Sequence, residues 1–301
     1  MDPSDNQYNN TTTDKPVISY QNTYQAQYNP RVIIVSLENN RNTLLKDFFR
    51  RYEISPLFQE DISCVKKYDI VVIADDSSSM TEPSEYLSFK TNKIVKKTRW
   101  DELQETIEII AELAVLLDDD GIDLWFLNVD NPIRNVTSKE TVMQHFNRSP
   151  SGRTPLTRVL KRVMEEPSVS GKPKLILVAT DGEPNDDDGY DDSENFLNLL
   201  KKRNVDKNRV SILACTSSDK QMKWLERVDT EAKHVDVIDD YNSEYEQIIK
   251  IQGKSFSYSR GDHILKMLLG PILQKYDDLD EKPINGLQIS AISKDICCIV
   301  M

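Results

Sequence analysis

The chain is poor in glycine and cysteine, and it lacks any long apolar run. Its 301 residues include 9 glycines and 4 cysteines. No segment approaches the roughly 18 consecutive apolar residues that a membrane span requires, and the start lacks the basic and then apolar pattern of a secretory signal. Because the cysteines show no disulfide-framework spacing, the sequence favours a reduced, cytoplasmic protein without a membrane-spanning segment.

Positive charge is also in deficit. Lys and Arg number 38 against 50 Asp and Glu, which gives a formal net charge of −12, and the pI is about 4.9. Proteins that bind the phosphate backbone of nucleic acids need a basic surface, and an anionic membrane surface attracts basic segments. We therefore expect no nucleic-acid partner and no purely electrostatic binding to a membrane.

The residue patterns of common catalytic sites are missing as well. The sequence contains no Gly-x-x-x-x-Gly-Lys-Ser/Thr loop and no Gly-x-Gly-x-x-Gly. Its three histidines, His145, His234 and His263, each stand alone in their segments, where core packing or surface exposure explains them. Since hydrolysis needs a nucleophile or a base with a partner, we expect no enzyme activity.

What the sequence does contain is a regular alternation of strand and helix patterns. Apolar runs at 68–74, 122–127, 174–180 and 209–215 predict buried strands, and an apolar stripe repeating every three or four residues predicts a helix over 98–119. This alternation predicts an α/β fold with a doubly wound, mostly parallel sheet and helices on both faces. Ligands of such sheets bind beyond the carboxyl ends of the strands.

Three other segments have weaker patterns. Residues 31–35 are expected to form a short strand or an extended lead, and residues 42–52 a helix. Residues 80–98 are expected to form a loop, which carries a basic stretch at residues 90–99. This stretch either steers an acidic partner or is a solvated connection, and we favour the second interpretation.

Hydroxyl and carboxylate side chains follow two of the predicted strands. Asp75, Ser77 and Ser79 come directly after the first strand, and Asp181 comes directly after the strand that ends at residue 180. Thr154 lies between them in the sequence and opens another predicted helix. Oxygen ligands suit Mg²⁺, Mn²⁺ or Ca²⁺ and are poor ligands for zinc or copper. The carboxyl edge of the sheet is therefore predicted to hold a divalent cation.

Taken in order, these five residues resemble the metal-ion-dependent adhesion site of the von Willebrand factor type A (VWA) family. The family pattern is Asp-x-Ser-x-Ser, a distant Thr and a distant Asp, and the likeness covers residues 66–250. Ser78 and Arg153 depart from the pattern, because many members have Gly there. The resemblance implies the family's Rossmann-like fold and a bound Mg²⁺, with Mn²⁺ or Ca²⁺ as alternatives.

The resemblance also implies a mechanism. The hydroxyls of Ser77, Ser79 and Thr154 would touch the cation, while Asp75 and Asp181 would act through bound water or as outer acceptors. One open coordination position would take an Asp or Glu of a partner protein. This implies a divalent-cation-dependent protein-interaction module. The alternatives are a metal-dependent enzyme or enzyme subunit, and a scaffold with a structural cation.

Further acidic residues lie close to the predicted site in the sequence. Asp76 follows the first ligand, and we interpret it as a solvated or cap-forming carboxylate rather than as a metal ligand. An acidic run after Asp181 either holds a second cation or forms a solvated loop, and we favour the loop because the run lacks EF-hand spacing. The residues of this run are Asp186, Asp187, Asp188, Asp191 and Asp192.

The two ends of the chain differ in composition from its centre. Residues 1–30 are rich in Asn, Gln, Thr and Tyr, which predicts a disordered tail, because such a segment buries too little apolar surface to offset its ordering entropy. We further expect an N-terminal extension at 31–65, a VWA domain at 66–252, a docking helix at 253–276 and a flexible tail at 277–301.

The last four residues form a Cys-aliphatic-aliphatic-Met end that begins at Cys298. This end looks like a farnesylation signal, and the adjacent Cys297 is a candidate for palmitoylation. A single lipid gives only marginal membrane affinity. We therefore expect two lipids or reversible visits, which would place this cytoplasmic protein at the cytoplasmic face of a membrane.

Overall fold

The computed structural model describes residues 30–216 and 219–284. The chain divides into two compact units, residues 1–40 and residues 41–301. Helix α1 (Pro30–Arg51) runs through the boundary between them. The expected strand or extended lead at 31–35 is therefore wrong, whereas the helix expected at 42–52 is confirmed. The tail predicted at residues 1–30 lies outside the described residues except for its last residue.

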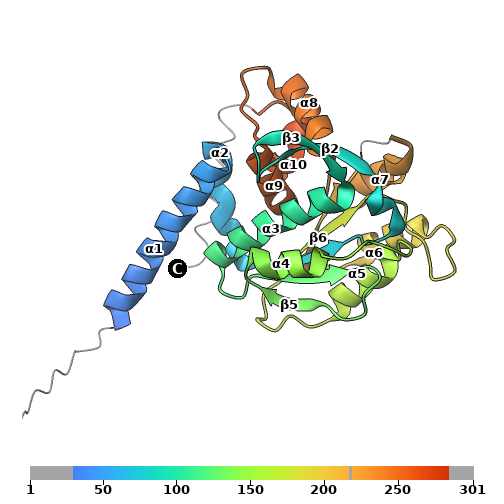
Figure 1. The fold of residues 1–301 in the computed structure, drawn as a ribbon, viewed down its shortest axis with the longest axis horizontal. Helices are drawn as coiled ribbons and strands as arrows, with labels where there is room; N and C mark the ends of the chain where they lie inside the picture. The colour runs from blue at the N-terminus through green and yellow to red at the C-terminus, as the bar shows by residue number, and fades with distance from the viewer. Residues whose placement is uncertain (1–29, 217–218, 285–301) are drawn as a thin grey trace, which may run out of the picture. The chain divides into compact units, whose positions relative to one another are not determined.

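A six-stranded sheet in the order β5-β4-β1-β6-β7-β8 forms the centre of the second unit (Figure 1). All neighbouring pairs are parallel except β4 with β5, so the predicted α/β class with a mostly parallel sheet is confirmed. The strands are β1 (Asp69–Ala74), β4 (Ile122–Phe126), β5 (Ile133–Val136), β6 (Lys174–Thr180), β7 (Asn208–Ala214) and β8 (Val235–Ile238).

Successive side chains of β1 enter two separate hydrophobic clusters. Ile70 and Val72 pack in one cluster, and Val71 and Ile73 pack in the other, as the two-residue period of a strand requires. Helices α3, α4 and α9 contribute to the first cluster, and α5, α6 and α7 to the second.

The remaining helical bounds are α2 (Pro56–Asp61), η1 (Ile62–Lys67), η2 (Ser78–Thr81), α3 (Arg99–Leu117), α4 (Lys139–Phe146), α5 (Leu156–Glu165), α6 (Ser193–Lys202), α7 (Asp219–Glu231), α8 (Tyr241–Gln252), α9 (Arg260–Leu269), α10 (Gln274–Asp277) and η3 (Asp278–Asp280).

The loop expected at residues 80–98 is largely a β-hairpin. Strands β2 (Pro83–Ser88) and β3 (Lys93–Thr98) pair antiparallel, and their turn includes Asn92 at a φ of 49°. Glu85 stands opposite Lys96 in the register, and their side chains form an ion pair of 2.9 Å. Cross-strand pairs of this kind stabilise a ribbon, and the high lysine content of β3 disguised it in the sequence.

Helix α3 leads from this hairpin and is fixed at its start by a capping box. The Thr98 hydroxyl accepts a hydrogen bond from the Asp101 backbone N–H at 3.1 Å, and the Asp101 carboxylate accepts one from the Thr98 N–H at 3.0 Å. Such reciprocal bonds satisfy N–H groups that have no partner within the helix. The box therefore sets the position of Arg99, the first helical residue.

A buried lysine joins β8, α8, α9 and η3. Lys266 has no exposed surface. Its Nζ lies 3.4 Å from Asp236 Oδ1, 2.9 Å from Glu244 Oε1 and 3.3 Å from Asp280 Oδ1. Asp280 belongs to the segment from residue 277 that we expected to be a flexible tail, and its neighbour Leu279 is fully buried. The domain bounds expected from the sequence stay predictions.

Glu244 should make the stability of the protein depend on pH. Burial raises the pKa of Glu244 from 4.5 to about 7. Between these two pH values, the folded protein therefore keeps a proton that the unfolded chain has released. Its contribution to the free energy of unfolding therefore falls as pH rises through this interval. We expect the stability of Glu244→Gln relative to wild type to increase between about pH 5 and about pH 7.5, as measured by urea unfolding. A difference that is constant with pH would contradict this assignment.

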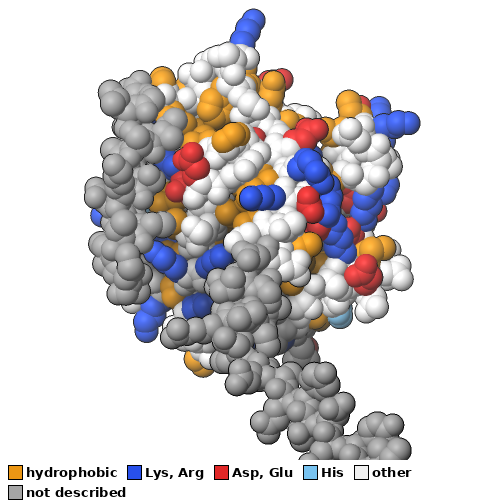
Figure 2. Space-filling model, turned by 90° about the vertical axis from the view of Figure 1, so that its left-hand side faces the viewer, with side chains coloured by type: hydrophobic (Ala, Val, Ile, Leu, Met, Phe, Trp, Pro, Cys, Tyr) orange, Lys and Arg blue, Asp and Glu red, His pale blue; other side chains and the backbone are white. Residues whose placement is uncertain are grey.

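The surface mixes both signs of charge. On the face shown in Figure 2, Lys and Arg side chains lie close to carboxylates at the right of the view, while those at the lower left are bordered by apolar and uncharged areas. Within the described residues, no helix is both long enough and apolar enough to span a bilayer.

Candidate functional site

The carboxyl ends of β1 and β6 bring two acidic loops side by side. Ala74 pairs with Ala179 in the parallel register, and the Asp75 N–H continues the ladder by donating to the Ala179 carbonyl at 2.9 Å. Asp75 and Asp181 therefore leave the sheet at the same edge. Both side chains are fully buried.

Hydrogen bonds link four of the predicted site residues into one chain. The Ser77 and Ser79 hydroxyl oxygens lie 3.1 Å apart, and Ser79 Oγ donates to Asp181 Oδ1 at 2.7 Å. Asp75 Oδ1 accepts the Ser77 backbone N–H at 2.8 Å, and its Oδ2 accepts the Thr180 hydroxyl at 2.6 Å. The carboxylate of Asp75 thus fixes the loop that carries both serines.

Thr154 reaches the same edge from a separate loop. Its backbone N–H donates to Asn185 Oδ1 at 2.9 Å, and its carbonyl accepts the Asn185 N–H at 3.0 Å. Its hydroxyl oxygen would lie 3.7 Å from a Cβ placed on Gly182, the residue after Asp181. The structure therefore brings all five predicted site residues together. Ser78 and Arg153, where a glycine was expected, do not have positive φ.

Arg99 is a member of this site that the sequence did not reveal. Its Nη1 donates to Asp181 Oδ2 at 2.7 Å, and its Nη2 lies 3.0 Å from Glu82 Oε2. The side chain of Arg99 is 11% exposed, so it is not part of a solvated connection. No local pattern indicates this contact, because Arg99 and Asp181 are 82 residues apart.

The site has an excess of negative charge. Burial raises the pKa of Asp75 to about 7, and the charge of Asp181 adds to this effect, although the hydrogen bonds from Ser77 and Thr180 oppose it. One guanidinium, that of Arg99, faces Asp181. Two buried carboxylates with a single cationic side chain favour a further positive charge at this edge.

Asp76 is not the solvated carboxylate that we expected. Its side chain is fully buried, and its Oδ1 accepts hydrogen bonds from the Asn128 backbone N–H and Nδ2, both at 2.9 Å. Its Oδ2 pairs with Arg148 at 2.7 Å. Asp76 therefore ties the end of β1 to the segment after β4 and to the loop after α4, and these partners occupy its oxygens.

The acidic run after Asp181 organises its own loop. Asp186 Oδ1 accepts three backbone N–H groups, from Asp188, Gly189 and Tyr190, at 3.0, 2.8 and 2.9 Å. The Asp187 carboxylate pairs with Arg158 at 2.7 Å, and both side chains are more than half exposed. These contacts agree with the favoured interpretation of a solvated loop.

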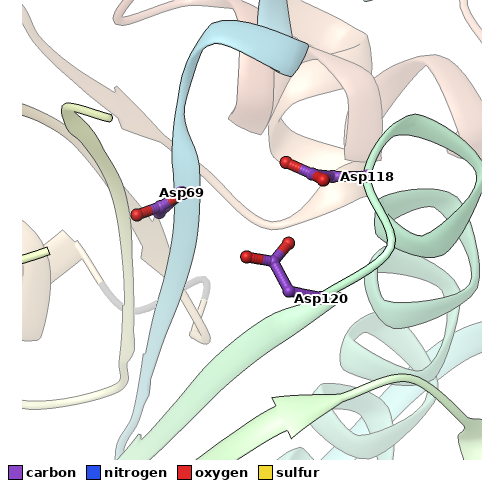
Figure 3. Close-up of side chains that lie close together, drawn as sticks. All are labelled: Asp69, Asp118 and Asp120. Atoms are coloured by element: carbon purple, nitrogen blue, oxygen red, sulfur yellow. The ribbon is translucent and has the colours of Figure 1, made fainter. Parts of the chain in front are cut away.

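A second group of carboxylates lies at the opposite edge of the sheet (Figure 3). Asp69, at the start of β1, and Asp118 and Asp120, after α3, offer oxygens within 4.8 Å of one another. Asp69 accepts from the Ser170 hydroxyl at 2.6 Å, and Asp118 pairs with Lys172. These three residues were not singled out from the sequence, because their spacing in the chain matches no recognisable metal-binding motif.

Comparisons with known proteins found no match among family models and none among curated proteins. Among solved structures, the chain is similar to the PilB minor pilin from Streptococcus sanguinis, with 14% identity, a TM-score of 0.41, and 70% of this chain and 62% of that chain covered. A mutant of the same pilin gives 15% identity, a TM-score of 0.42, and coverage of 71% and 62%. The chain thus spans less than two thirds of these structures, and likeness at this level carries no argument about what this chain does.

Three predictions are corrected by these findings. The chain was identified as a VWA domain protein, but no family model matches and the similar structures are described as a minor pilin. The function inferred from the resemblance, a cation-dependent interaction module tethered by lipid, is therefore wrong as well. The interpretation of the chain as a prenylated lipoprotein is likewise not supported. Cys297 and Cys298 lie outside the described residues. A partner that presents Asp or Glu and a cytoplasmic location stay predictions.

Proposed function

We propose that the carboxyl edge of the sheet binds a divalent cation, Mg²⁺ or alternatively Mn²⁺ or Ca²⁺. The hydroxyls of Ser77, Ser79 and Thr154 would be the ligands. One observation carries the proposal: Ser77, Ser79 and Asp181 form a continuous chain of oxygens, with contacts of 3.1 and 2.7 Å, at a buried edge where Asp75 adds a second carboxylate.

The side chains fit such an ion chemically. All five predicted residues offer hard oxygen atoms, which Mg²⁺, Mn²⁺ and Ca²⁺ prefer. Asp75 holds the Ser77 backbone and the Thr180 hydroxyl, and so keeps the serine loop in place before any ion arrives. Neighbours that orient the ligands of a metal commonly change its affinity by 10–100-fold, roughly the contribution expected of Asp75.

We infer a binding role rather than a catalytic one. The site residues carry hydroxyls, carboxylates and one guanidinium, and none of them is a histidine that could act as a general base. The buried His263 has its Nδ1 3.1 Å from the Tyr258 hydroxyl, so its hydrogen bond is made to Tyr258 and not to a site residue. A bound cation would link the loops after β1 and β6 to the loop before α5. We also propose that the sheet is doubly wound, with helices on both of its faces. The division of the β1 side chains between two hydrophobic clusters supports this arrangement.

Arg99 should compete with the cation for Asp181. Its guanidinium supplies positive charge to Asp181 Oδ2, which a bound dication would otherwise supply. We therefore expect Arg99→Gln to tighten Mn²⁺ binding by about tenfold, because one neighbouring positive charge is removed. Electron paramagnetic resonance of free Mn²⁺ measures the change.

Arg158→Gln is the matched control for this experiment. Arg158 pairs with Asp187 on the exposed acidic loop, so its removal should leave the affinity unchanged. Weaker Mn²⁺ binding in Arg99→Gln than in wild type would show that Arg99 supports the ion instead, and equal binding would place the ion away from Asp181.

A further inference from the structure

The hairpin β2–β3 forms a sheet of its own beside α3 (Figure 1). Glu105 of α3 anchors it: its Oε1 accepts the Ser88 hydroxyl at 2.8 Å, and its Oε2 accepts the Phe89 N–H at 3.1 Å. Tyr86 on β2 is 4% exposed, and its hydroxyl lies 3.3 Å from the same Glu105 Oε1. These contacts hold the hairpin through β2 and the turn, and none of them involves β3.

One edge of β3 carries backbone groups that lack a partner strand. β2 pairs with one side of β3, and no other strand in the described part of the chain pairs with it. The Arg99 N–H donates to the Glu82 carbonyl at 3.0 Å, which makes these two residues a hydrogen-bonded pair. Since bonded and non-bonded pairs alternate along an antiparallel ladder, the N–H and C=O groups of Ile94 and Lys96 point away from β2. The Thr98 N–H points the same way and is taken by the capping box of α3.

The hairpin is basic although the chain as a whole is acidic. Residues 83–98 contain four lysines and one glutamate. Two of the lysines, Lys90 and Lys96, pair with carboxylates. Lys93 and Lys97 are exposed, and neither forms an ion pair with any residue that the structure describes. Because salt screens exposed charges beyond about 8 Å, these two lysines set the potential at this edge more than distant acidic residues do.

The side chains of β3 present two different faces to an added strand. Lys93 and Lys97 stand two residues before and two residues after Val95, so all three share one face. Ile94 lies on the opposite face and is 68% exposed. A strand added to this edge would therefore meet both lysines with residues four apart, and would meet Ile94 with a residue of its other face.

We propose that the free edge of β3 binds an extended acidic segment of a partner protein as a further antiparallel strand. The backbone groups of Ile94 and Lys96 supply the ladder, as in other cases of strand addition to a sheet edge. Two carboxylates four residues apart meet Lys93 and Lys97, and an apolar side chain covers Ile94. This inference does not depend on the cation proposal, because it uses none of the proposed ligands.

Charge distinguishes this partner from the chain itself. A second copy that paired through the same edge would bring lysines against lysines, and lysines on an edge strand are a common protection against such pairing. Residues 1–29 and 285–301, which lie outside the described part, contain no two acidic residues four apart. The required pattern therefore has to come from another protein.

The test uses a fluorescein-labelled peptide, Ser-Glu-Thr-Val-Ile-Glu-Ser, and the full-length protein in EDTA. Fluorescence anisotropy should show binding with a Kd of about 0.1 mM or tighter. Lys93→Gln combined with Lys97→Gln should weaken it about tenfold, because two cross-strand charge pairs are lost. Lys66→Gln combined with Lys67→Gln is the matched control: it removes the same charge from exposed positions of η1 and should bind as wild type does.

Methylation of the peptide backbone separates a strand ladder from simple charge attraction. In the antiparallel register with the peptide valine opposite Val95, the N–H groups of the peptide threonine and isoleucine donate to β3. Methylating these two nitrogens should abolish binding although both glutamates remain. Methylating the valine nitrogen, which points away from β3, should leave the affinity within about twofold of the parent peptide.

Three results would overturn the proposal. The first is no change in anisotropy up to about 0.5 mM protein. The second is equal binding of the parent peptide and the peptide methylated at threonine and isoleucine, and the third is equal binding by wild type and the Lys93 and Lys97 double variant. Vesicles containing phosphatidylserine provide a further arm: if they bound the protein through these lysines and the peptide did not bind, the edge would belong to an anionic membrane contact instead.

Discussion

Replacing Lys266 with methionine should lower the free energy of unfolding by about 3–5 kcal/mol. Burial alone would lower the pKa of Lys266, but the carboxylates of Asp236, Glu244 and Asp280 raise it above its usual value, so the lysine is charged. Methionine fills a similar volume and removes the charge. At about pH 8, above the pKa of about 7 at which Glu244 releases its proton, buried carboxylates would then face one another without a cation, which is the costly half of a broken buried ion pair.

Urea unfolding of wild type and Lys266→Met measures this loss directly. Lys161→Met is the matched control, because Lys161 pairs with Glu165 at 3.8 Å on the surface and both side chains are more than half exposed. Its effect should stay within about 0.5 kcal/mol. If Lys266→Met were as stable as Lys161→Met, the carboxylates around it would be protonated in the folded protein.

Replacing Asp75 with asparagine should weaken Mn²⁺ binding by about 100-fold. The amide keeps the shape of the side chain but removes the negative charge from the buried edge. Because burial raises the pKa of Asp75 to about 7, the neutral side chain should cost little in stability without a cation. Loss of cation binding should therefore occur in a protein that remains folded.

Isothermal titration with Mn²⁺ and a melting curve of the same sample separate these two effects. Asp187→Asn provides the control, since the Asp187 carboxylate is 70% exposed on the acidic loop. It should bind Mn²⁺ as wild type does. Equal affinity in Asp75→Asn and wild type would remove Asp75 from the proposed site.

The strands were the most predictable part of the fold. Every residue of β6 is buried, as are five of the six in β1, so both appear in the sequence as unbroken apolar runs with acidic residues directly after them. Parallel pairing of these two strands was enough to place Asp75 and Asp181 together. The hairpin was missed because β3 is mostly exposed and its sequence, KIVKKT, lacks the apolar–polar alternation that a half-buried strand shows.

Long-range partners were beyond the reach of sequence patterns. Arg99 meets Asp181 across 82 residues, and Arg148 meets Asp76 across 72, so no spacing rule connects them. The same limit explains the interpretation of Asp76 as solvated: a carboxylate next to a loop looks exposed until the fold supplies its partners. Helix α1 was misjudged at residues 31–35, where an apolar run of branched residues fits a strand equally well.

The family identification failed for a different reason. Five oxygen-bearing residues in a fixed order describe a local arrangement, and the structure does assemble them, but such an arrangement does not carry a family or its function with it. The comparisons gave no family model, and the similar structures are described as a minor pilin. The chemistry of the edge therefore has to be tested on this chain itself.

An anomalous difference map from crystals soaked in Mn²⁺ tests the cation site most directly. The account predicts a peak about 2.0–2.6 Å from the hydroxyl oxygens of Ser77, Ser79 and Thr154. Peaks confined to surface carboxylates, such as those of Asp118 and Asp120, with none at the edge beyond β1 and β6, would contradict it.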